Sequence, residues 1–379
     1  MRTIRSGDRG DDVRDVQQRL VALGVHLDPA EIEGGFGHET ESAVRAFQQR
    51  RGLLVDGRVG SETWNELVEA GYRLGDRVLY LRMPMLRGDD VRSLQRRLNS
   101  LGFDAGREDG IFGERCDRAV REFQRNIAMR QDGIVGPETL HELERVRPAT
   151  VDARSGAVLR ETEALRRMKA TLEGARIAID PGHGPDEPGA AGAEGLLAEA
   201  DAAWDLSVAL AAELDRRGAQ PLLLRERDED PPVSARAAAA NEWGAEICLS
   251  VHLNAHTDPR AEGSMCLFYG NETTSSPSGQ RLAEAIQEEL TSRIGLTDGR
   301  THSMSIAILR ETRMPAVQIE PCFVTNPREE RLLSEEPFRR DVAIAIARGV
   351  ERFLGARPGA QGSPGLDDRA SNGQARLPA

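Results

Sequence analysis

Two segments near the start of this chain repeat the same pattern of apolar residues and glycines, and this repeat limits the fold more than any other feature. Residues 7–14 read GDRGDDVR and residues 85–92 read MLRGDDVR, and the correspondence continues to Glu62–Thr63 and Glu138–Thr139. The offset between the copies is 78 residues at first and 76 after a small difference in length. In each copy, three stretches with apolar residues at helical spacing are separated by glycine-containing turns. The pattern predicts two copies of one small three-helix domain.

The rest of the chain changes character after the second repeat. Strand-like apolar runs there alternate with helical ones, which implies a mostly parallel sheet covered by helices. The last residues are rich in Gly, Pro, Ala and Ser without apolar periodicity, as in disordered segments. We therefore predict a multidomain chain: repeat 1 at 1–72, repeat 2 at 80–147, a linker with a short helix at 148–174, an α/β domain at 175–354 and a disordered tail at 355–379.

Hydrophobic patterning places the elements of the α/β domain. The strands are expected at 176–180, 220–225, 246–251, 265–269, 305–309 and 316–320. The helices are expected at 199–217, 233–243, 278–294 and 337–354.

Charge and composition exclude several classes of protein. The formal net charge of −12 argues against a nucleic-acid partner, because binding to phosphates needs a basic surface. No stretch of about 18 apolar residues is present, so we expect no membrane span. The N-terminal residues MRTIRSGDRG lack the apolar core of a secretory signal, which predicts a cytoplasmic protein. The four cysteines are scattered and form no C-x-x-C pair, which fits a reducing compartment.

Four polar side chains follow the predicted strands or open the helix after one. His183 follows the first strand, His252 the third, Glu320 closes the last, and Glu199 begins the first helix of the α/β domain. Open α/β sheets place their sites at the carboxyl ends of the strands. Two imidazoles and one carboxylate form a standard catalytic Zn²⁺ set, which His183, Glu199 and His252 could supply. Glu320 could then serve as the general base that is not bound to metal.

Each of these residues also has a simpler structural interpretation. A single histidine after a strand, such as His252, is more often an ordinary surface or core residue than a metal ligand. Glu199 could be a first-turn glutamate favoured by the helix dipole. Glu194, five residues earlier, is a rival ligand, and His256 is expected to be a loop residue. Residue types and spacing therefore predict a metal site but no substrate.

The two repeats resemble the small helical peptidoglycan-binding domain found in many wall hydrolases. The resemblance rests on the ordered motifs G-D-D-V, L-x-x-L-G, D-G-x-F-G, A-V-x-x-F-Q and D-G-x-V-G-x-x-T. The second repeat has all of them, including Asp109–Gly113. The first departs at Glu33–Gly37, which reads EGGFG. Most of these positions are structural, so the resemblance implies the domain more strongly than it implies glycan binding by both copies.

The α/β region resembles the type-3 zinc N-acetylmuramoyl-L-alanine amidases along its whole length. The matching pieces are IAIDPGHG at 177–184, PGA at 188–190, Glu199, Leu223 with Arg225 and Asp228, R-x-x-x-A-N at 236–241, SVHLNA at 250–255, MPAVQIE at 314–320 and FVTNP at 323–327. The resemblance implies that His183, Glu199 and His252 bind Zn²⁺ and that Glu320 is the catalytic acid/base. It also implies hydrolysis of the amide between N-acetylmuramic acid and L-alanine of the stem peptide.

Residues 199–206, EADAAWDL, resemble an actinobacterial subgroup of this family that has two N-terminal binding repeats and no signal peptide. Members of that subgroup are implicated in cytoplasmic control of peptidoglycan precursor synthesis. Two functions are therefore expected as alternatives. The first is a zinc amidase acting on peptidoglycan, its precursors or muropeptides, at the wall if another export route exists. The second is a cytoplasmic regulator or sensor with little or no turnover that binds a cell-wall biosynthesis protein.

Overall fold

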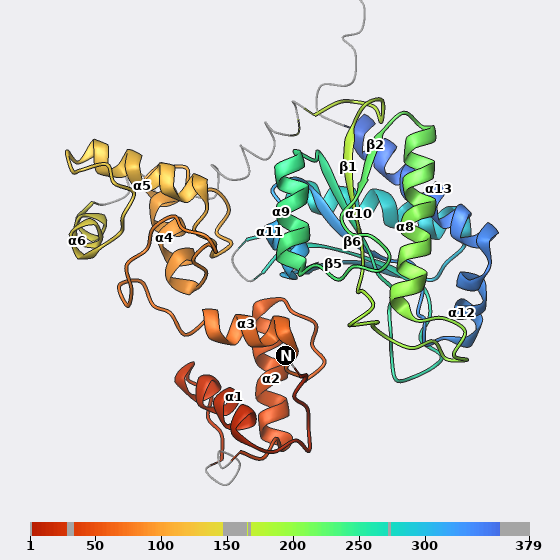
Figure 1. The fold of residues 1–379 in the computed structure, drawn as a ribbon, viewed down its shortest axis with the longest axis horizontal. Helices are drawn as coiled ribbons and strands as arrows, with labels where there is room; N and C mark the ends of the chain where they lie inside the picture. The colour runs from red at the N-terminus through yellow and green to blue at the C-terminus, as the bar shows by residue number, and fades with distance from the viewer. Residues whose placement is uncertain (1, 29–33, 147–164, 166–167, 272–273, 357–379) are drawn as a thin grey trace, which may run out of the picture.

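The computed structural model describes residues 2–28, 34–146, 165, 168–271 and 274–356. Two groups of short helices form the N-terminal part, and a sheet flanked by longer helices forms the rest (Figure 1). Most of the predicted linker and nearly all of the predicted tail lie outside the described residues. No helix in the described part of the chain is long and apolar enough to cross a membrane.

Each repeat forms three helices around its own apolar core, as predicted. Repeat 1 contains α1 (Asp11–Ala22), α2 (His38–Arg51) and α3 (Ser61–Glu69). Repeat 2 contains α4 (Asp89–Ser100), α5 (Glu114–Asn126) and α6 (Pro137–Arg145). The apolar positions shared by the two copies are buried in two separate clusters, and these include Val13, Leu20 and Phe47 in repeat 1 and Val91, Leu98 and Phe123 in repeat 2.

The F-Q and D-G motifs of the repeats are structural, because each glutamine holds the turn that follows its helix. Gln48 Nε2 donates to Asp56 Oδ1 at 2.8 Å, and its Oε1 accepts from the Gly57 amide at 2.9 Å. Gln124 makes the same pair of contacts with Asp132 and Gly133 in repeat 2. The aspartate–glycine turn therefore depends on a side chain eight residues earlier.

The α/β domain is built on one six-stranded sheet with the order β2-β1-β3-β6-β4-β5. Strands β1, β2, β3 and β6 run parallel, whereas β4 is antiparallel to β6 and parallel to β5. The prediction of a mostly parallel sheet is confirmed. The strands are β1 (Arg176–Pro181), β2 (Gln220–Leu223), β3 (Ile247–Val251), β4 (Ser264–Tyr269), β5 (Asp298–Met304) and β6 (Ala316–Glu320).

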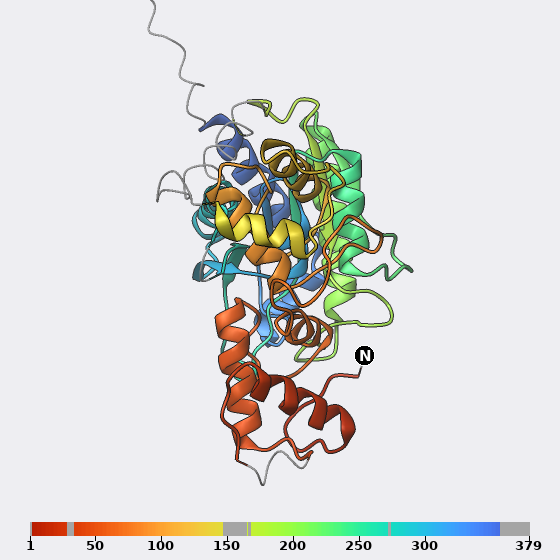
Figure 2. The same ribbon diagram turned by 90° about the vertical axis from the view of Figure 1, so that its left-hand side faces the viewer.

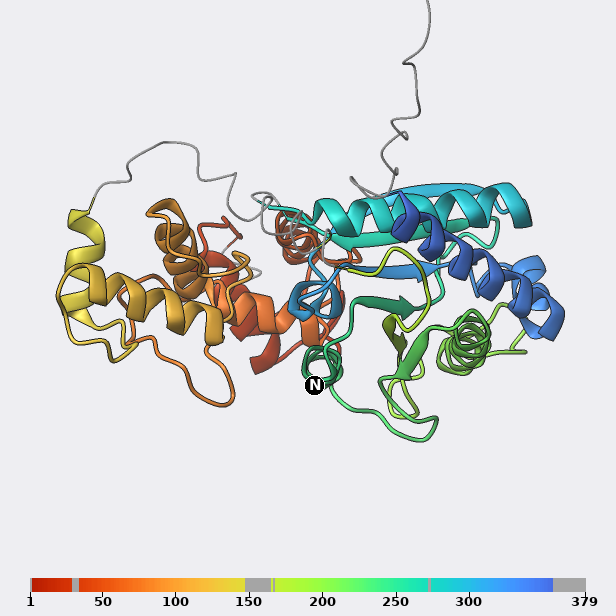
Figure 3. The same ribbon diagram turned by 90° about the horizontal axis from the view of Figure 1, so that it is seen from above.

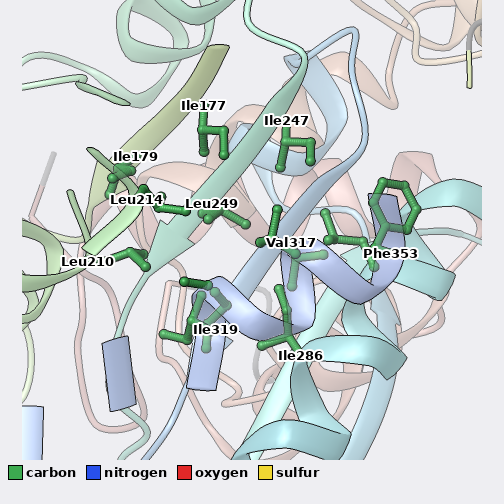
Figure 4. Packing of buried hydrophobic residues seen from close by; sticks show 14 of the residues in the cluster. Ile177, Ile179, Leu210, Leu214, Ile247, Leu249, Ile286, Val317, Ile319 and Phe353 are labelled. Carbon is green, nitrogen blue, oxygen red and sulfur yellow. The ribbon is translucent and has the colours of Figure 1, made fainter. Parts of the chain in front are cut away.

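Helices cover both faces of the sheet. On one face lie α8 (Glu199–Arg216), α10 (Pro277–Glu289) and α13 (Glu336–Gly355), with α10 and α13 prominent from above (Figure 3). Their apolar side chains pack with Ile177, Leu249 and Val317 of the central strands in the largest apolar cluster (Figure 4). On the other face, α9 (Val233–Trp243) and α11 (Ala307–Glu311) cover Ala178 and Cys248. The central strands are buried on both faces, which holds their carboxyl ends in place.

One predicted strand is wrong. The run at 305–309 is not a strand, because Ala307–Glu311 forms the short helix α11. The fifth strand is instead Asp298–Met304, a polar segment at the sheet edge whose side chains alternate between exposed and partly buried. An edge strand with one pairing partner needs little apolar surface, so its sequence carries no strong strand signal. The structure also adds α12 (Pro327–Ser334) and a π-helical turn at Leu290–Ile294.

Repeat 1, drawn red to orange at the lower end of the molecule in Figure 2, docks on the α/β domain through a buried cluster of charges. Arg310 of α11 donates to Glu66 of α3, and both side chains are at most 4% exposed. The amide of Ala307 donates to Glu62 Oε1 at 2.7 Å. The cluster also joins repeat 2, because Arg87 pairs with Glu311 at 2.5 Å.

The docking cluster contains more carboxylates than guanidinium groups. Glu62, Glu66, Glu69 and Glu311 surround Arg310, with Arg87 beside them. Burial raises the pKa of Glu62 and of Glu69 to about 7, although the charge of Arg310 opposes the shift. Since the folded pKa exceeds the ordinary glutamate value of 4.5, the folded state retains protons that the unfolded state releases between about pH 4.5 and 7. Stability from this cluster is therefore fully present below that window and falls as the pH rises through it.

Glu62→Gln is expected to raise the melting temperature at pH 8 and to leave it unchanged near pH 4.5. The amide keeps the acceptor for Ala307 but removes a charge from a cluster that is rich in carboxylates. We expect an increase of about 2–4 °C, the shift that roughly 1 kcal/mol produces in a domain of 150–250 residues. Scanning calorimetry at both pH values measures it. Glu138→Gln is the matched control, because Glu138 is the exposed counterpart of Glu62 in repeat 2. Equal shifts for the two variants would contradict the prediction.

Candidate metal and catalytic site

The carboxyl ends of three parallel strands bring the predicted site residues to one edge of the sheet. The register pairs Pro181 of β1 with Val251 of β3, and Val251 with Ile319 of β6. His183, His252 and Glu320 stand one or two residues beyond these paired positions. Because the three ends are level, side chains from strands far apart in sequence meet at the same place.

His183, Glu199 and His252 form one tight cluster. His183 Nε2 lies 3.0 Å from Glu199 Oε1, and His252 Nδ1 lies 3.2 Å from the same oxygen. The three ligand atoms all lie within 4.8 Å of one another, and no other group of this kind occurs among the described residues. The imidazole rings stand edge to face, with centroids 4.9 Å apart. The structure thus brings together the three residues predicted as metal ligands, and their binding of a metal stays a prediction.

The dimensions of the cluster fit a tetrahedral metal ion. Zn²⁺ binds imidazole nitrogen and carboxylate oxygen at about 2.0–2.2 Å, so neighbouring ligands of a tetrahedral ion are about 3.3 Å apart. The separations of 3.0 and 3.2 Å are close to that value. Three protein ligands leave the fourth position open, as catalytic sites require. The donor set therefore suits a catalytic divalent metal.

The charges at the cluster favour a cation. Burial alone would raise the pKa of Glu199, but hydrogen bonds with His183 and His252 outweigh it and hold the pKa well below its usual range. Burial lowers the pKa of His183, yet the contact with Glu199 dominates and the net shift is upward. A carboxylate that stays ionised in a largely buried site is suited to bind positive charge.

Backbone groups fix the orientation of the ligands. The amide of Ala190 donates to Glu199 Oε2 at 3.0 Å, and the amide of Leu253 donates to Oε1 at 3.2 Å. His183 makes a hydrogen bond with the backbone of Glu187, which orients its ring toward the cluster. Such outer partners set the tautomer and direction of metal-binding imidazoles.

A buried network of polar groups supports the loop that carries His183. Arg236 donates to Asp180 Oδ1 at 2.5 Å and to the carbonyl of Pro181 at 2.9 Å. Arg225 donates to the same carbonyl at 3.0 Å and to the carbonyl of Gly182 at 3.1 Å. His183 itself has a φ of +58°, which is uncommon for a residue with a side chain and persists only where the surroundings enforce it.

Two glycines allow the ligands to approach closely. A Cβ on Gly182 would lie 2.6 Å from the ring of His252. A Cβ on Gly189 would lie 2.5 Å from Glu199 Oε2 and 2.8 Å from His183 Cδ2. Both glycines belong to the motifs DPGHG and PGA, but the sequence alone assigned them no role. The signal that the sequence offered was the position of both glycines in these motifs. The close approach of the ligand side chains explains why glycine stands at these two positions.

Gly189→Ala is expected to weaken metal binding by about 10–100-fold, as changes next to metal ligands do. The added methyl group would push apart Glu199 and His183. Metal titration with a chromophoric competitor measures the affinity. Gly195→Ala is the matched control, because Gly195 lies in the same loop with a φ of +70° but has no atom within 4 Å of its Cβ position. If both variants bound metal equally well, the steric argument would fail.

Glu320 lies beside the cluster without belonging to it. It ends β6 and is partly buried, and its Oε1 accepts from Gln318 Nε2 at 2.8 Å. Burial raises the pKa of Glu320 to about 7, and the nearby charge of Glu199 adds to the shift. A carboxyl group with a pKa near neutrality can both accept and donate a proton at physiological pH.

The rival residues lie elsewhere. Glu194 is paired with Arg331 at the surface and is not part of the three-residue cluster. His256 is exposed in a loop, where its Nδ1 accepts from the amide of Asp258 at 3.0 Å.

All four cysteines are free and buried.

Comparison with known proteins gives matches for both parts of the chain. Residues 177–352 match the family described as N-acetylmuramoyl-L-alanine amidase. Residues 9–67 and 87–143 each match the family described as a peptidoglycan binding domain. Both resemblances drawn from the sequence motifs are thereby confirmed.

Similarity to one relative extends over nearly the whole chain. The N-acetylmuramoyl-L-alanine amidase CwlM of Mycobacterium tuberculosis is 40% identical over 363 residues, covering 92% of this chain and 89% of the relative. The amidase LytC of Bacillus subtilis is 31% identical over 192 residues, 51% of this chain and 38% of its own length. Among solved structures, the amidase AmiC2 of Nostoc punctiforme is 28% identical, with a TM-score of 0.44, and covers 48% of this chain and 97% of that one.

Proposed function

Because the chain belongs to the N-acetylmuramoyl-L-alanine amidase family, we propose that it cleaves the amide between N-acetylmuramic acid and L-alanine in peptidoglycan, its precursors or muropeptides. The observation that carries the proposal is the convergence of His183, Glu199 and His252 at the carboxyl edge of the sheet. An oriented three-ligand metal site beside a carboxyl group of raised pKa is suited to metal-assisted hydrolysis.

We propose Zn²⁺ as the metal and His183, Glu199 and His252 as its protein ligands. Two neutral imidazoles and one carboxylate would leave the centre with a net charge of about +1. When bound there, the ion supplies Lewis-acid polarisation of the amide carbonyl and of the attacking water. The glycines and backbone amides around the ligands keep the donor atoms directed at one point.

Glu320 is proposed to move the proton. In its ionised form it accepts a proton from the attacking water, and in its protonated form it returns that proton to the departing L-alanine nitrogen. Because the pKa of Glu320 is about 7, its ionised and its protonated forms are both populated near neutral pH. The hydrogen bond from Gln318 fixes the position of the carboxylate without bringing it into the metal cluster.

The two repeats are proposed to bind peptidoglycan. Repeat 1 docks on the α/β domain next to α11, and Arg107 of repeat 2 donates to the carbonyl of Thr312 at 3.1 Å. Both contacts lie just before β6, whereas Glu320 is at the far end of that strand. The contacts that dock the repeats therefore lie away from His183, Glu199 and His252, and we propose that the repeats tether the chain to glycan and do not line the active site.

One experiment tests the activity and the metal together. The purified full chain is analysed for bound metal and then incubated with peptidoglycan and with a soluble muramyl-peptide precursor. We expect one Zn²⁺ per chain and new N-terminal L-alanine on the released peptides. Chelation should abolish the release and Zn²⁺ should restore it. Bound zinc without cleavage of either substrate would reject the amidase proposal and favour the regulator that binds a cell-wall biosynthesis protein.

A further inference from the structure

A basic cleft lies where the two repeats meet the α/β domain. It encloses about 330 Å³, within the range of small-molecule sites. Repeat 1 contributes the residue that follows α1 and the end of α2, repeat 2 contributes α4, and the α/β domain contributes residues that follow β4 and β5. The lining residues are Leu23, Phe47, Arg50, Arg51, Asp89, Arg92, Ser93, Arg96, Asn271 and Ser305.

The charge of the cleft is opposite to that of the protein. Four arginines and a single aspartate line it, giving four positive charges and one negative, a net of +3. The whole chain carries −12. Glu66 and Glu108 approach Arg51 and Arg96 from outside the lining at 3.9 and 3.3 Å, and the charge of Glu69 also acts on Arg51, so the positive excess belongs to the lining itself. An anion entering the cleft would therefore meet more guanidinium groups than carboxylates.

The guanidinium groups in the cleft are not fully used by protein partners. Arg51 donates to Asp89 at 2.8 and 2.6 Å, and Arg92 donates to the same carboxylate at 2.5 Å, so two cations share one anion. Arg92 is 11% exposed, and its buried Nε has no partner among the described residues. Arg50 is exposed and has no ion-pair partner in the described part of the chain.

The internal repeat shows that these arginines are not needed to form a three-helix domain. At the offsets that relate the copies, Arg50 corresponds to Asn126, Arg51 to Ile127 and Arg96 to Gln18. Three of the four arginines therefore have no basic counterpart in the other copy. Arg50 and Arg51 end α2, Arg96 lies on α4, and all three line the cleft.

We infer that this cleft binds a small phosphate-bearing molecule, whose anionic group contacts Arg50, Arg51, Arg92 and Arg96. Guanidinium groups bind phosphate oxygens bidentately, and a diphosphate matches a net charge of +3 better than one carboxylate does. Leu23, which is partly buried, offers an apolar contact for an attached ring, and Ser93 offers a hydroxyl group. The ligand class is a nucleoside diphosphate or a similar ring-bearing diphosphate.

The cleft is separate from the metal cluster. Asn271 follows β4 and Ser305 follows β5. Strand β4 is antiparallel to β6, so its end lies near Val317, whereas Glu320 pairs with Met265 at its beginning. A ligand in the cleft therefore does not compete with substrate at the metal. It contacts both repeats and the α/β domain at once, so its binding stabilises their docked arrangement.

Calorimetric titration of the full chain tests the inference. The probes are inorganic diphosphate, a nucleoside diphosphate and, as a dicarboxylate of smaller charge, succinate. We expect saturable binding of both diphosphates that weakens as salt is added, with succinate at least tenfold weaker. Absence of diphosphate binding at millimolar concentration, or preference for succinate, would overturn the inference.

The double variant R50A/R96A locates the binding. The Arg96 side chain is 53% exposed, and Arg50 is exposed as well. Both lie outside the apolar cores, so the variant should keep the wild-type melting temperature. We expect its dissociation constant for diphosphate to rise at least tenfold. Arg118→Ala is the control, since Arg118 is an exposed arginine on α5 away from the cleft, and its affinity should stay within twofold. Diphosphate binding that persists in R50A/R96A would be binding elsewhere, the metal cluster included, and would refute the assignment.

Discussion

His183→Ala is expected to remove bound metal and amide hydrolysis together. The substitution deletes one of three ligand atoms that meet around Glu199 Oε1. Losing an outer-shell partner weakens metal binding by about 10–100-fold, and losing a ligand should exceed that range. Metal analysis after dialysis and measurement of released L-alanine termini on the same sample test both effects. Far-ultraviolet circular dichroism should remain unchanged, since the ring lies at the edge of the sheet and outside the apolar clusters.

Two neighbouring substitutions provide the comparison. Glu194→Ala should keep metal and activity, because Glu194 is paired with Arg331 and lies outside the cluster. His256→Ala should also keep both, because His256 is an exposed loop residue. If Glu194→Ala lost the metal while Glu199→Ala retained it, the ligand set would have to be redrawn around Glu194.

Elements with a strong local signal could be predicted closely from the sequence. Helix α9 occupies Val233–Trp243, the range expected, because Pro232 precedes it and Gly244 ends it in the left-handed conformation. The convergence of His183, Glu199 and His252 could be anticipated for a related reason. Parallel strands bring their carboxyl ends to one edge, so polar residues just after buried strands are expected to meet.

Features that depend on distant contacts could not be predicted. The edge strand β5 has almost no apolar residues, whereas the apolar run beside it folds as α11 against α9. Arg236 reaches Asp180 across 56 positions, and Arg310 reaches Glu66 across 244. Such pairs leave no periodic trace in the sequence. The support of the His183 loop and the docking of repeat 1 therefore become visible only in the folded chain.

Glu320→Gln is expected to lower the rate of amide hydrolysis by roughly 10²–10⁴-fold, the range typical of general acid–base catalysis. Glutamine keeps the shape of the side chain and can still accept the hydrogen bond from Gln318, but it cannot take a proton from water. Metal occupancy should stay near that of the wild type, because Glu320 is not one of the three clustered ligands. This combination separates Glu320→Gln from His183→Ala, which loses both properties.

The pH dependence gives the same substitution a second measurable consequence. If Glu320 is the base, wild-type kcat/KM should rise as the pH increases through about 7, where the carboxyl group loses its proton. The residual activity of Glu320→Gln should lack that rise.

The melting temperature of Glu320→Gln should change in the opposite direction from its rate of hydrolysis. Because the folded pKa of Glu320 is raised, ionisation of this residue disfavours the folded state above about pH 7, and the neutral amide avoids that penalty. The variant should therefore melt at or above the wild-type temperature at pH 8. A purely structural role for Glu320 predicts a lower melting temperature and proportionate loss of active protein. Unchanged hydrolysis, or an unaltered pH profile in Glu320→Gln, would remove this residue from the mechanism.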